Sequence, residues 1–135
     1  MPNGHQGSQA DWARMEAPLL GVDEVIADFA RRRNLVLSKN YHGSPERSLT
    51  WDDGIRRLIQ LYLQDPEKLT FNLWLCASQD RGSSRFWKND FILKERRIEE
   101  FSASLPALLQ QGFETLTAWK APDLEFVTNV KFPPP

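Results

Sequence analysis

Two runs of alternating side chains, separated by a short turn signal, most strongly constrain how this chain can fold. Residues 55–63 carry isoleucine or leucine at every second position except Arg57, and residues 69–78 repeat the alternation with leucine, phenylalanine and alanine. A period of two is typical of strands that bury one face. The sequence DPEK at 65–68 favours a type I turn, because proline suits its second position. These runs therefore predict two adjacent antiparallel strands.

The alternation assigns the side chains of these two strands to different faces. One face is apolar and is the predicted core: Ile59, Leu61, Leu63, Phe71, Leu73 and Leu75. The opposite face mixes polar and aromatic groups: Arg56, Gln60, Tyr62, Asn72, Trp74, Cys76 and Ser78. Because helices need an apolar surface to cover, we expect them on the first face only.

The remaining periodicities predict a helix on each side of the sheet region and further strands within it. Apolar residues recur at three and four positions between Val22 and Ala30, and arginines follow at 31–33, where cations stabilise a helix C-terminus. The helical spacing returns at 105–119, after a short turn at 98–102. Strand-like stretches are expected at 35–37, 48–51, 85–93 and 124–130.

Consecutive strands joined by tight turns pair as an antiparallel meander. We therefore predict an α+β fold: an antiparallel sheet of four to five strands in a meander, flanked by an N-terminal and a C-terminal helix packed on one face. A length of 135 residues fits one domain. We expect that domain to span residues 11–131, with a disordered arm at 1–10 and a disordered tail at 132–135, since neither end offers an apolar pattern.

Charge and composition argue against several classes of partner. With 17 basic and 18 acidic side chains, the net charge is −1, which gives no strong field for nucleic acid or an anionic membrane. No apolar run reaches the ~20 residues that cross a bilayer, and the N-terminus lacks the apolar stretch of a signal peptide. The single cysteine suits a reducing compartment. We therefore expect a cytoplasmic protein without a membrane or nucleic-acid partner.

The polar and aromatic face of the sheet is the predicted functional surface. Arginine and tryptophan contribute much of the energy of desolvated contacts, and the chain has five tryptophans. We expect a non-enzymatic binding or adaptor domain that uses this face for a protein partner or for self-association as a homodimer. Its predicted anchors are Arg56, Tyr62, Trp74 and Trp87.

A different site is suggested by residues 40–54, NYHGSPERSLTWDDG. In an enzyme or small-molecule-binding domain, His42 would act as a general base, Arg47 as an anion clamp, and Asp52 or Asp53 would orient the imidazole. The same stretch also reads as a polar hairpin whose Glu46 and Arg47 are solvated, since turn-forming residues stand at both of its ends. The geometry of the fold decides between these interpretations.

The motifs of cofactor-dependent and nucleophilic enzymes are missing from the sequence. Two histidines and one cysteine make no zinc spacing, and no glycine-rich phosphate loop or Gly-x-Ser-x-Gly elbow is present. Cys76 stands in the middle of a predicted strand, where cysteine usually acts as a small buried apolar residue. We therefore expect no cofactor and no metal, and we favour a binding domain over an enzyme.

Overall fold

The computed structural model describes residues 9–41 and 43–127. The elements follow in chain order: α1 (Gln9–Leu20), α2 (Asp23–Arg33), β1 (Val36–Lys39), β2 (Glu46–Asp52), β3 (Arg56–Asp65), β4 (Thr70–Arg81), β5 (Ser84–Arg97), α3 (Ile98–Phe101), a 3₁₀ turn (Ser102–Ser104), α4 (Leu105–Ala118), a second 3₁₀ turn (Ala121–Asp123) and β6 (Glu125–Phe126). The predicted tail at 132–135 and residues 1–8 of the predicted arm lie outside the described residues, whereas Gln9 and Ala10 begin α1.

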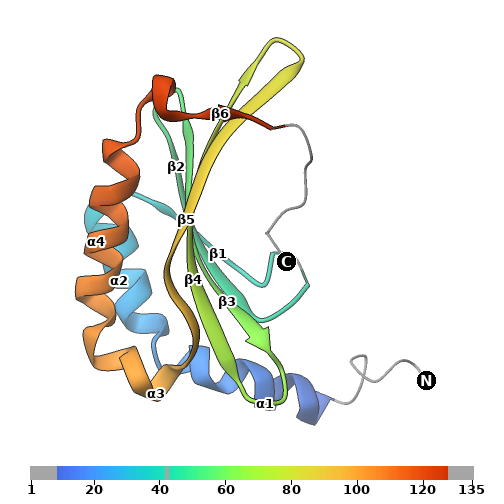
Figure 1. Ribbon diagram of the computed structural model, residues 1–135. Helices are drawn as coiled ribbons and strands as arrows, with labels where there is room; N and C mark the ends of the chain where they lie inside the picture. The colour runs from blue at the N-terminus through green and yellow to red at the C-terminus, as the bar shows by residue number, and fades with distance from the viewer. Residues whose placement is uncertain (1–8, 42, 128–135) are drawn as a thin grey trace.

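The strands form one antiparallel sheet in the order β1-β2-β3-β4-β5-β6, so each strand pairs with its neighbours along the chain (Figure 1). The predicted α+β meander is confirmed. The sheet has six strands rather than four to five, because Glu125 and Phe126 of β6 pair with Trp87 and Phe86 at the edge of β5. In Figure 1, α2 and α4 lie along one side of the sheet, and the opposite side carries no labelled helix.

The apolar face of the sheet forms the core with these helices, as the alternation predicts. The register places Ile59 opposite Leu75 and Leu61 opposite Leu73, and all four side chains are buried. Facing them on α4 are the buried residues Leu105, Leu109, Gly112 and Leu116. Leucine and isoleucine on a sheet face meet a leucine stripe at helical spacing, which gives two layers around one core.

Gly112 lies in the middle of α4 because the helix approaches the sheet closely there. A Cβ atom built on Gly112 would lie 3.0 Å from Leu75 Cδ2 and 3.8 Å from Ile59 Cδ1. Glycine costs about 1 kcal/mol relative to alanine inside a helix. At this position, the missing side chain gives the helix room to contact the central strands.

The helix α1 is the main element that the sequence analysis does not predict. It contains Pro18 in its last turn and buries only Met15 and Leu19, so its apolar periodicity is weak. Its position depends on residues far along the chain: Arg14 donates to the carbonyl oxygen of Pro66 at 3.0 Å, and Glu16 accepts from Arg47 at 3.2 Å. Tertiary contacts therefore stabilise this helix.

Within the described ranges, no helix is long and apolar enough to cross a membrane.

Candidate binding cavity on the open face of the sheet

The side of the sheet on which the described residues place no helix, here called the open face, carries rows of side chains from neighbouring strands. Residues directly opposite one another in a sheet share a face. Across β2, β3 and β4 the register therefore gives three rows: Ser48–Gln60–Trp74, Thr50–Leu58–Cys76 and Asp52–Arg56–Ser78. These rows contain the polar and aromatic positions that the alternation assigns to this face, except Tyr62 and Asn72, which pair in the next row.

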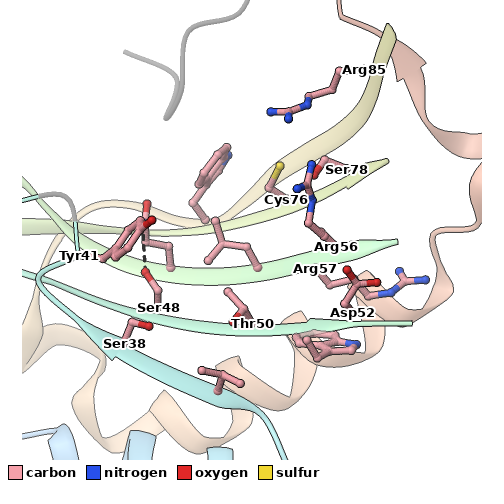
Figure 2. Close-up of a pocket in the computed structure, with 15 residues that line it drawn as sticks. Ser38, Tyr41, Ser48, Thr50, Asp52, Arg56, Arg57, Cys76, Ser78 and Arg85 are labelled. Carbon is pink, nitrogen blue, oxygen red and sulfur yellow. Dashed lines mark hydrogen bonds between the residues drawn. The ribbon is translucent and has the colours of Figure 1, made fainter. Parts of the chain in front are cut away.

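A cavity of about 660 Å³ opens on this face (Figure 2). Its lining is mainly apolar and comes from β1 to β5, with Thr50, Leu58 and Cys76 of the middle row among its members. Figure 2 shows Tyr41 and Ser48 toward one end of the cavity, and Arg56 and Arg85 toward the other. Sites for small molecules commonly have volumes of about 300–1,000 Å³ and a few polar groups on an apolar surface.

A buried polar cluster stands next to the Tyr41 end of this cavity. Glu46 is 2% exposed and Gln60 is 1% exposed, although both belong to the open face. Gln60 Nε2 donates to Glu46 Oε2 at 3.3 Å and to Ser48 Oγ at 3.2 Å, and Ser48 Oγ donates to Glu46 Oε1 at 3.4 Å. The side-chain oxygen of Gln60, Oε1, has no hydrogen-bond partner among the described residues.

The opposite end of the cavity carries two guanidinium groups that share one carboxylate. Arg56 Nη2 lies 3.2 Å from Asp80 Oδ2, and Arg85 Nε lies 2.9 Å from Asp80 Oδ1. The hydrogen bond from Arg85 and the two positive charges lower the pKa of Asp80, against a smaller opposing effect of burial. All three side chains are at least partly exposed, so this cluster is solvated and screened.

The four predicted partner-binding residues share the open face but not one site. Arg56 and Trp74 line the cavity. Tyr62 lies one row beyond it and accepts a hydrogen bond from Asn72 Nδ2 at 3.0 Å. Trp87 pairs with Ser78 on one side and with Glu125 on the other, near the edge of the sheet. Trp74 is buried, and its indole donates to Asn89 Oδ1 at 3.3 Å.

Arg47, the predicted anion clamp, instead lies on the helix side of the sheet. It is 1% exposed and stands opposite Leu61 of the core face. Its guanidinium donates through Nε to Asp23 Oδ1 at 2.5 Å and through Nη2 to Glu16 Oε2 at 3.2 Å. These contacts connect β2 to both N-terminal helices. The interpretation of Glu46 and Arg47 as solvated hairpin residues is wrong, because both are buried.

The other members of the alternative site do not converge on one point. Asp53 contacts Arg57 Nε at 3.0 Å, and Arg57 points to the carbonyl oxygens of Leu116 and Trp119 at the end of α4. Asp52 lines the cavity and accepts from the backbone N–H of Gly54 at 2.9 Å. His42 lies outside the described residues. The structure therefore brings Asp52 to the cavity, places Arg47 at helix contacts and pairs Asp53 with Arg57.

Cys76 lines the cavity but has the properties of a structural cysteine. Burial raises the pKa of its thiol to about 12, which outweighs the charges of Arg85 and Arg56. Because the thiolate is the reactive form of cysteine, the buried thiol is a poor nucleophile. The described ranges contain no cluster of three or more side chains suited to hold a metal ion.

Comparison with other proteins does not assign this chain to a class: no family, no curated protein and no solved structure matches it.

The polar cluster is the part of the site that the sequence analysis misses. Gln60 is assigned correctly to the open face, but the alternation does not show that Glu46 and Ser48 stand beside it. That proximity depends on the register of β2 against β3, which pairs Ser48 with Gln60 and Glu46 with Tyr62. A longer predicted β2, beginning at Glu46 rather than Ser48, is the one signal that would have revealed it.

Proposed function

We propose that this protein is a non-enzymatic binding domain that takes its ligand into the open-face cavity. The observation that carries this proposal is the cavity itself, about 660 Å³ in volume and lined from five neighbouring strands. Side chains on paired strands hold their positions better than side chains on loops, which favours a preformed binding site. The buried polar groups at one end supply directional contacts, and the apolar lining supplies contact area.

The chemistry of the lining residues supports binding rather than catalysis. A nucleophile needs a lowered pKa or an adjacent base, and Cys76 has a raised pKa. A general base needs an orienting partner near the reacting atoms. Arg47 and Asp53, which the sequence analysis groups with His42, instead make ion pairs on the helix side of the sheet.

The proposal can be tested by filling the cavity. Thr50 lines the cavity and is half-buried, so the Thr50→Trp variant would place an indole ring in the hollow. A set of small molecules is screened by thermal shift against the full chain and against this variant. Gln111→Trp is the matched control, because Gln111 is an exposed residue of α4.

We expect some compounds to raise the melting temperature of the wild-type protein and of Gln111→Trp, but not that of Thr50→Trp. Binding to native protein raises the melting temperature by mass action, so loss of the shift reports loss of the site. If every stabilising compound acts equally on Thr50→Trp, the cavity is not the binding site and the proposal fails.

A second candidate function, contact with a protein partner or a second copy, is favoured by the rim of the same cavity. Val36 is 62% exposed and Tyr41 is 75% exposed, and both line the cavity, Val36 opposite Thr50 of the middle row and Tyr41 at one end. Large exposed apolar side chains that lie together often mark interfaces. Sedimentation over a concentration range, for the wild-type protein and a Val36→Ser/Tyr41→Ala variant, tests self-association. A wild-type monomer at all concentrations contradicts the homodimer.

A further inference from the structure

The chemical class of the ligand follows from two arginines at one end of the cavity, in an inference that rests on the proposed function. Arg56 and Arg85 both line the cavity, and their side chains are 52% and 37% exposed, so a ligand can reach them. Figure 2 shows both side chains toward the same end, here called the arginine end. Because a guanidinium group only donates hydrogen bonds, this end of the cavity suits a ligand with acceptor atoms.

Most of the donors of these two arginines are unused. A guanidinium group has five N–H donors, and among the described residues each of these arginines uses one. Arg56 Nη2 donates to Asp80 Oδ2 at 3.2 Å, and Arg85 Nε donates to Asp80 Oδ1 at 2.9 Å. Asp80 is not among the residues that line the cavity, so the other donors are available to a ligand there.

The charges at the arginine end favour an anion with a single negative charge. Two guanidinium groups and one carboxylate, those of Arg56, Arg85 and Asp80, leave one net positive charge. Asp52 also lines the cavity opposite Arg56, but its carboxylate accepts from the backbone N–H of Gly54 in the β2–β3 turn. A phosphate monoester, with a charge of about −2, would leave negative charge uncompensated beside Asp52 and Asp80. A carboxylate therefore fits better.

The field of the two arginines extends into the middle of the cavity. Cys76 stands in the middle row, and the charges that act on its thiol are those of Arg85 and Arg56. Both charges favour the anionic form, although burial outweighs them and raises the pKa of the thiol to about 12. The same charges favour a ligand carboxylate nearer to them, and more strongly once the ligand displaces the water that screens them.

The middle row of the open face provides apolar contact for the rest of the ligand. Side chains on one face of a strand are two residues apart, which is about 7 Å, so Leu58 stands about 7 Å along β3 from Arg56. Cys76 lies opposite Leu58 on one side, and Val36 follows across β2, with 62% of its surface exposed. An aromatic ring joined to a carboxylate by a short chain covers this distance.

We infer that the cavity binds a small monocarboxylate with an apolar or aromatic body, and that the carboxylate accepts hydrogen bonds from Arg56 and Arg85. Hydrogen bonds between ionised partners are roughly twice as strong as neutral ones, and paired N–H groups of a guanidinium match the two oxygens of a carboxylate. The apolar body extends from the arginine end over Leu58. A neutral amide of the same shape has one acceptor oxygen and adds donors that the guanidinium groups cannot accept.

Three probes test this inference on the full chain. 4-Phenylbutanoate has both the head group and the body, 4-phenylbutanamide replaces the carboxylate with a neutral amide of nearly the same shape, and acetate has the head group without the body. Binding is followed by NMR titration of ¹⁵N-labelled protein, read at the backbone N–H groups of Leu58 and Cys76. We expect 4-phenylbutanoate to bind at least tenfold more tightly than either of the other probes.

Paired substitutions identify the residues that hold the head group. In Arg56→Gln/Arg85→Gln, both positive charges are lost, so the affinity for 4-phenylbutanoate should fall at least tenfold, while that for the amide should change less than twofold. Arg31→Gln/Arg32→Gln is the matched control, because these exposed arginines of α2 also share one carboxylate, that of Asp28. The two double variants change the net charge equally, so a general effect of charge would weaken binding in both.

The possible results separate this inference from the proposed function. The carboxylate inference is overturned, while the cavity remains the site, if the amide or acetate binds as tightly as 4-phenylbutanoate, or if the two double variants bind 4-phenylbutanoate equally. Failure of all three probes to bind also overturns it alone, because the thermal-shift comparison tests the cavity independently. Binding of 4-phenylbutanoate that persists in Thr50→Trp overturns both proposals. The NMR spectrum reports whether each variant is folded, and if Arg56→Gln/Arg85→Gln is not, the preference of the wild-type protein among the probes decides the inference.

Discussion

The guanidinium of Arg57 on β3 lies 2.9 Å from the carbonyl oxygen of Trp119, although 62 positions separate the two residues. The same guanidinium also donates to the carbonyl oxygen of Leu116 and contacts Asp53. The last carbonyl groups of a helix have no partner within the helix. This buried arginine donates to two carbonyl groups there and so connects the C-terminal end of α4 to the core face of the sheet.

Loss of this connection should destabilise the protein strongly. In Arg57→Met, the carbonyl oxygen of Trp119 loses its side-chain donor, that of Leu116 keeps only the backbone N–H of Trp119, and Asp53 loses its ion pair, so we expect the free energy of unfolding to fall by about 3 kcal/mol. Urea unfolding followed by tryptophan fluorescence measures this change. Arg56→Met is the neighbouring control, because the ion pair of Arg56 with Asp80 is exposed and screened by water, so its loss should change stability little. Equal losses in the two variants would contradict the role given to Arg57.

The ion pairs of Arg47 predict a dependence of stability on pH. Burial opposes ionisation of Asp23, but the hydrogen bonds and charge of Arg47, joined by those of Lys39, outweigh it and lower the pKa of this carboxyl. A hydrogen bond from Asn40, together with Arg47, likewise lowers the pKa of Glu16. Lowered carboxyl pKa values stabilise the fold above the unfolded pKa values of about 4, and this stability is lost as the pH falls through the folded values.

We expect Arg47→Met to be about 3–5 kcal/mol less stable than the wild-type protein at pH 7. The difference should shrink as the pH is lowered from 5 to 3, because Asp23 and Glu16 become protonated in the wild-type protein and lose their attraction to Arg47. Urea unfolding at several pH values measures both quantities. A difference that stays constant down to pH 3 would show that these carboxylates do not contribute through Arg47.

The close approach of Gly112 to Leu75 predicts that replacing this helical glycine with alanine lowers the stability of the protein rather than raising it. Alanine favours helix by about 1 kcal/mol over glycine. Here the added Cβ atom would lie 3.0 Å from a fully buried leucine, and overpacking of a core typically costs about 1–3 kcal/mol. We expect Gly112→Ala to lower the free energy of unfolding by about 1 kcal/mol, measured by thermal or urea unfolding. Ala107→Gly, at an exposed position of α4, provides the effect of helix propensity alone. A Gly112→Ala variant more stable than wild type would show that Leu75 yields easily.

The raised pKa of Cys76 predicts slow reaction of the native thiol. With a pKa of about 12, the thiolate fraction at pH 8 is roughly a thousandfold lower than for an ordinary exposed cysteine. Since the chain has one cysteine, the release of thionitrobenzoate from Ellman's reagent reports this residue alone. We expect very slow reaction in buffer and rapid reaction in concentrated urea. Rapid reaction of the folded protein would mean that the thiol is exposed or activated.

The strands were the most predictable part of this protein. The alternation at 55–63 and 69–78 assigns Ile59, Leu61, Leu73 and Leu75 to the core face, and the structure confirms each of them. The helix at 105–119 is also confirmed, as Leu105–Ala118. These segments repeat one pattern over many residues, so local geometry alone specifies which side chains share a face.

The polar side chains were much less predictable. Arg47 reads as a solvated or ligand-binding group from its neighbours in sequence, but its partners Asp23 and Glu16 are 24 and 31 positions away. Whether a charged side chain is solvated or buried depends on the approach of such distant partners. The same holds for α1, whose weak apolar pattern becomes a stable helix only through its contacts with β2 and the β3–β4 turn.

The sequence by itself determined the class of fold, the two faces of the sheet and the helix side, because periodicity is a local property of the chain. Only the tertiary structure decided that Gln60, Ser48 and Glu46 form one buried cluster beside a cavity, that Arg47 pairs with a helix carboxylate and that Asp53 pairs with Arg57. The physical reason is strand register. A shift of one residue in the pairing of β2 and β3 would have separated these groups without changing the pattern of either strand.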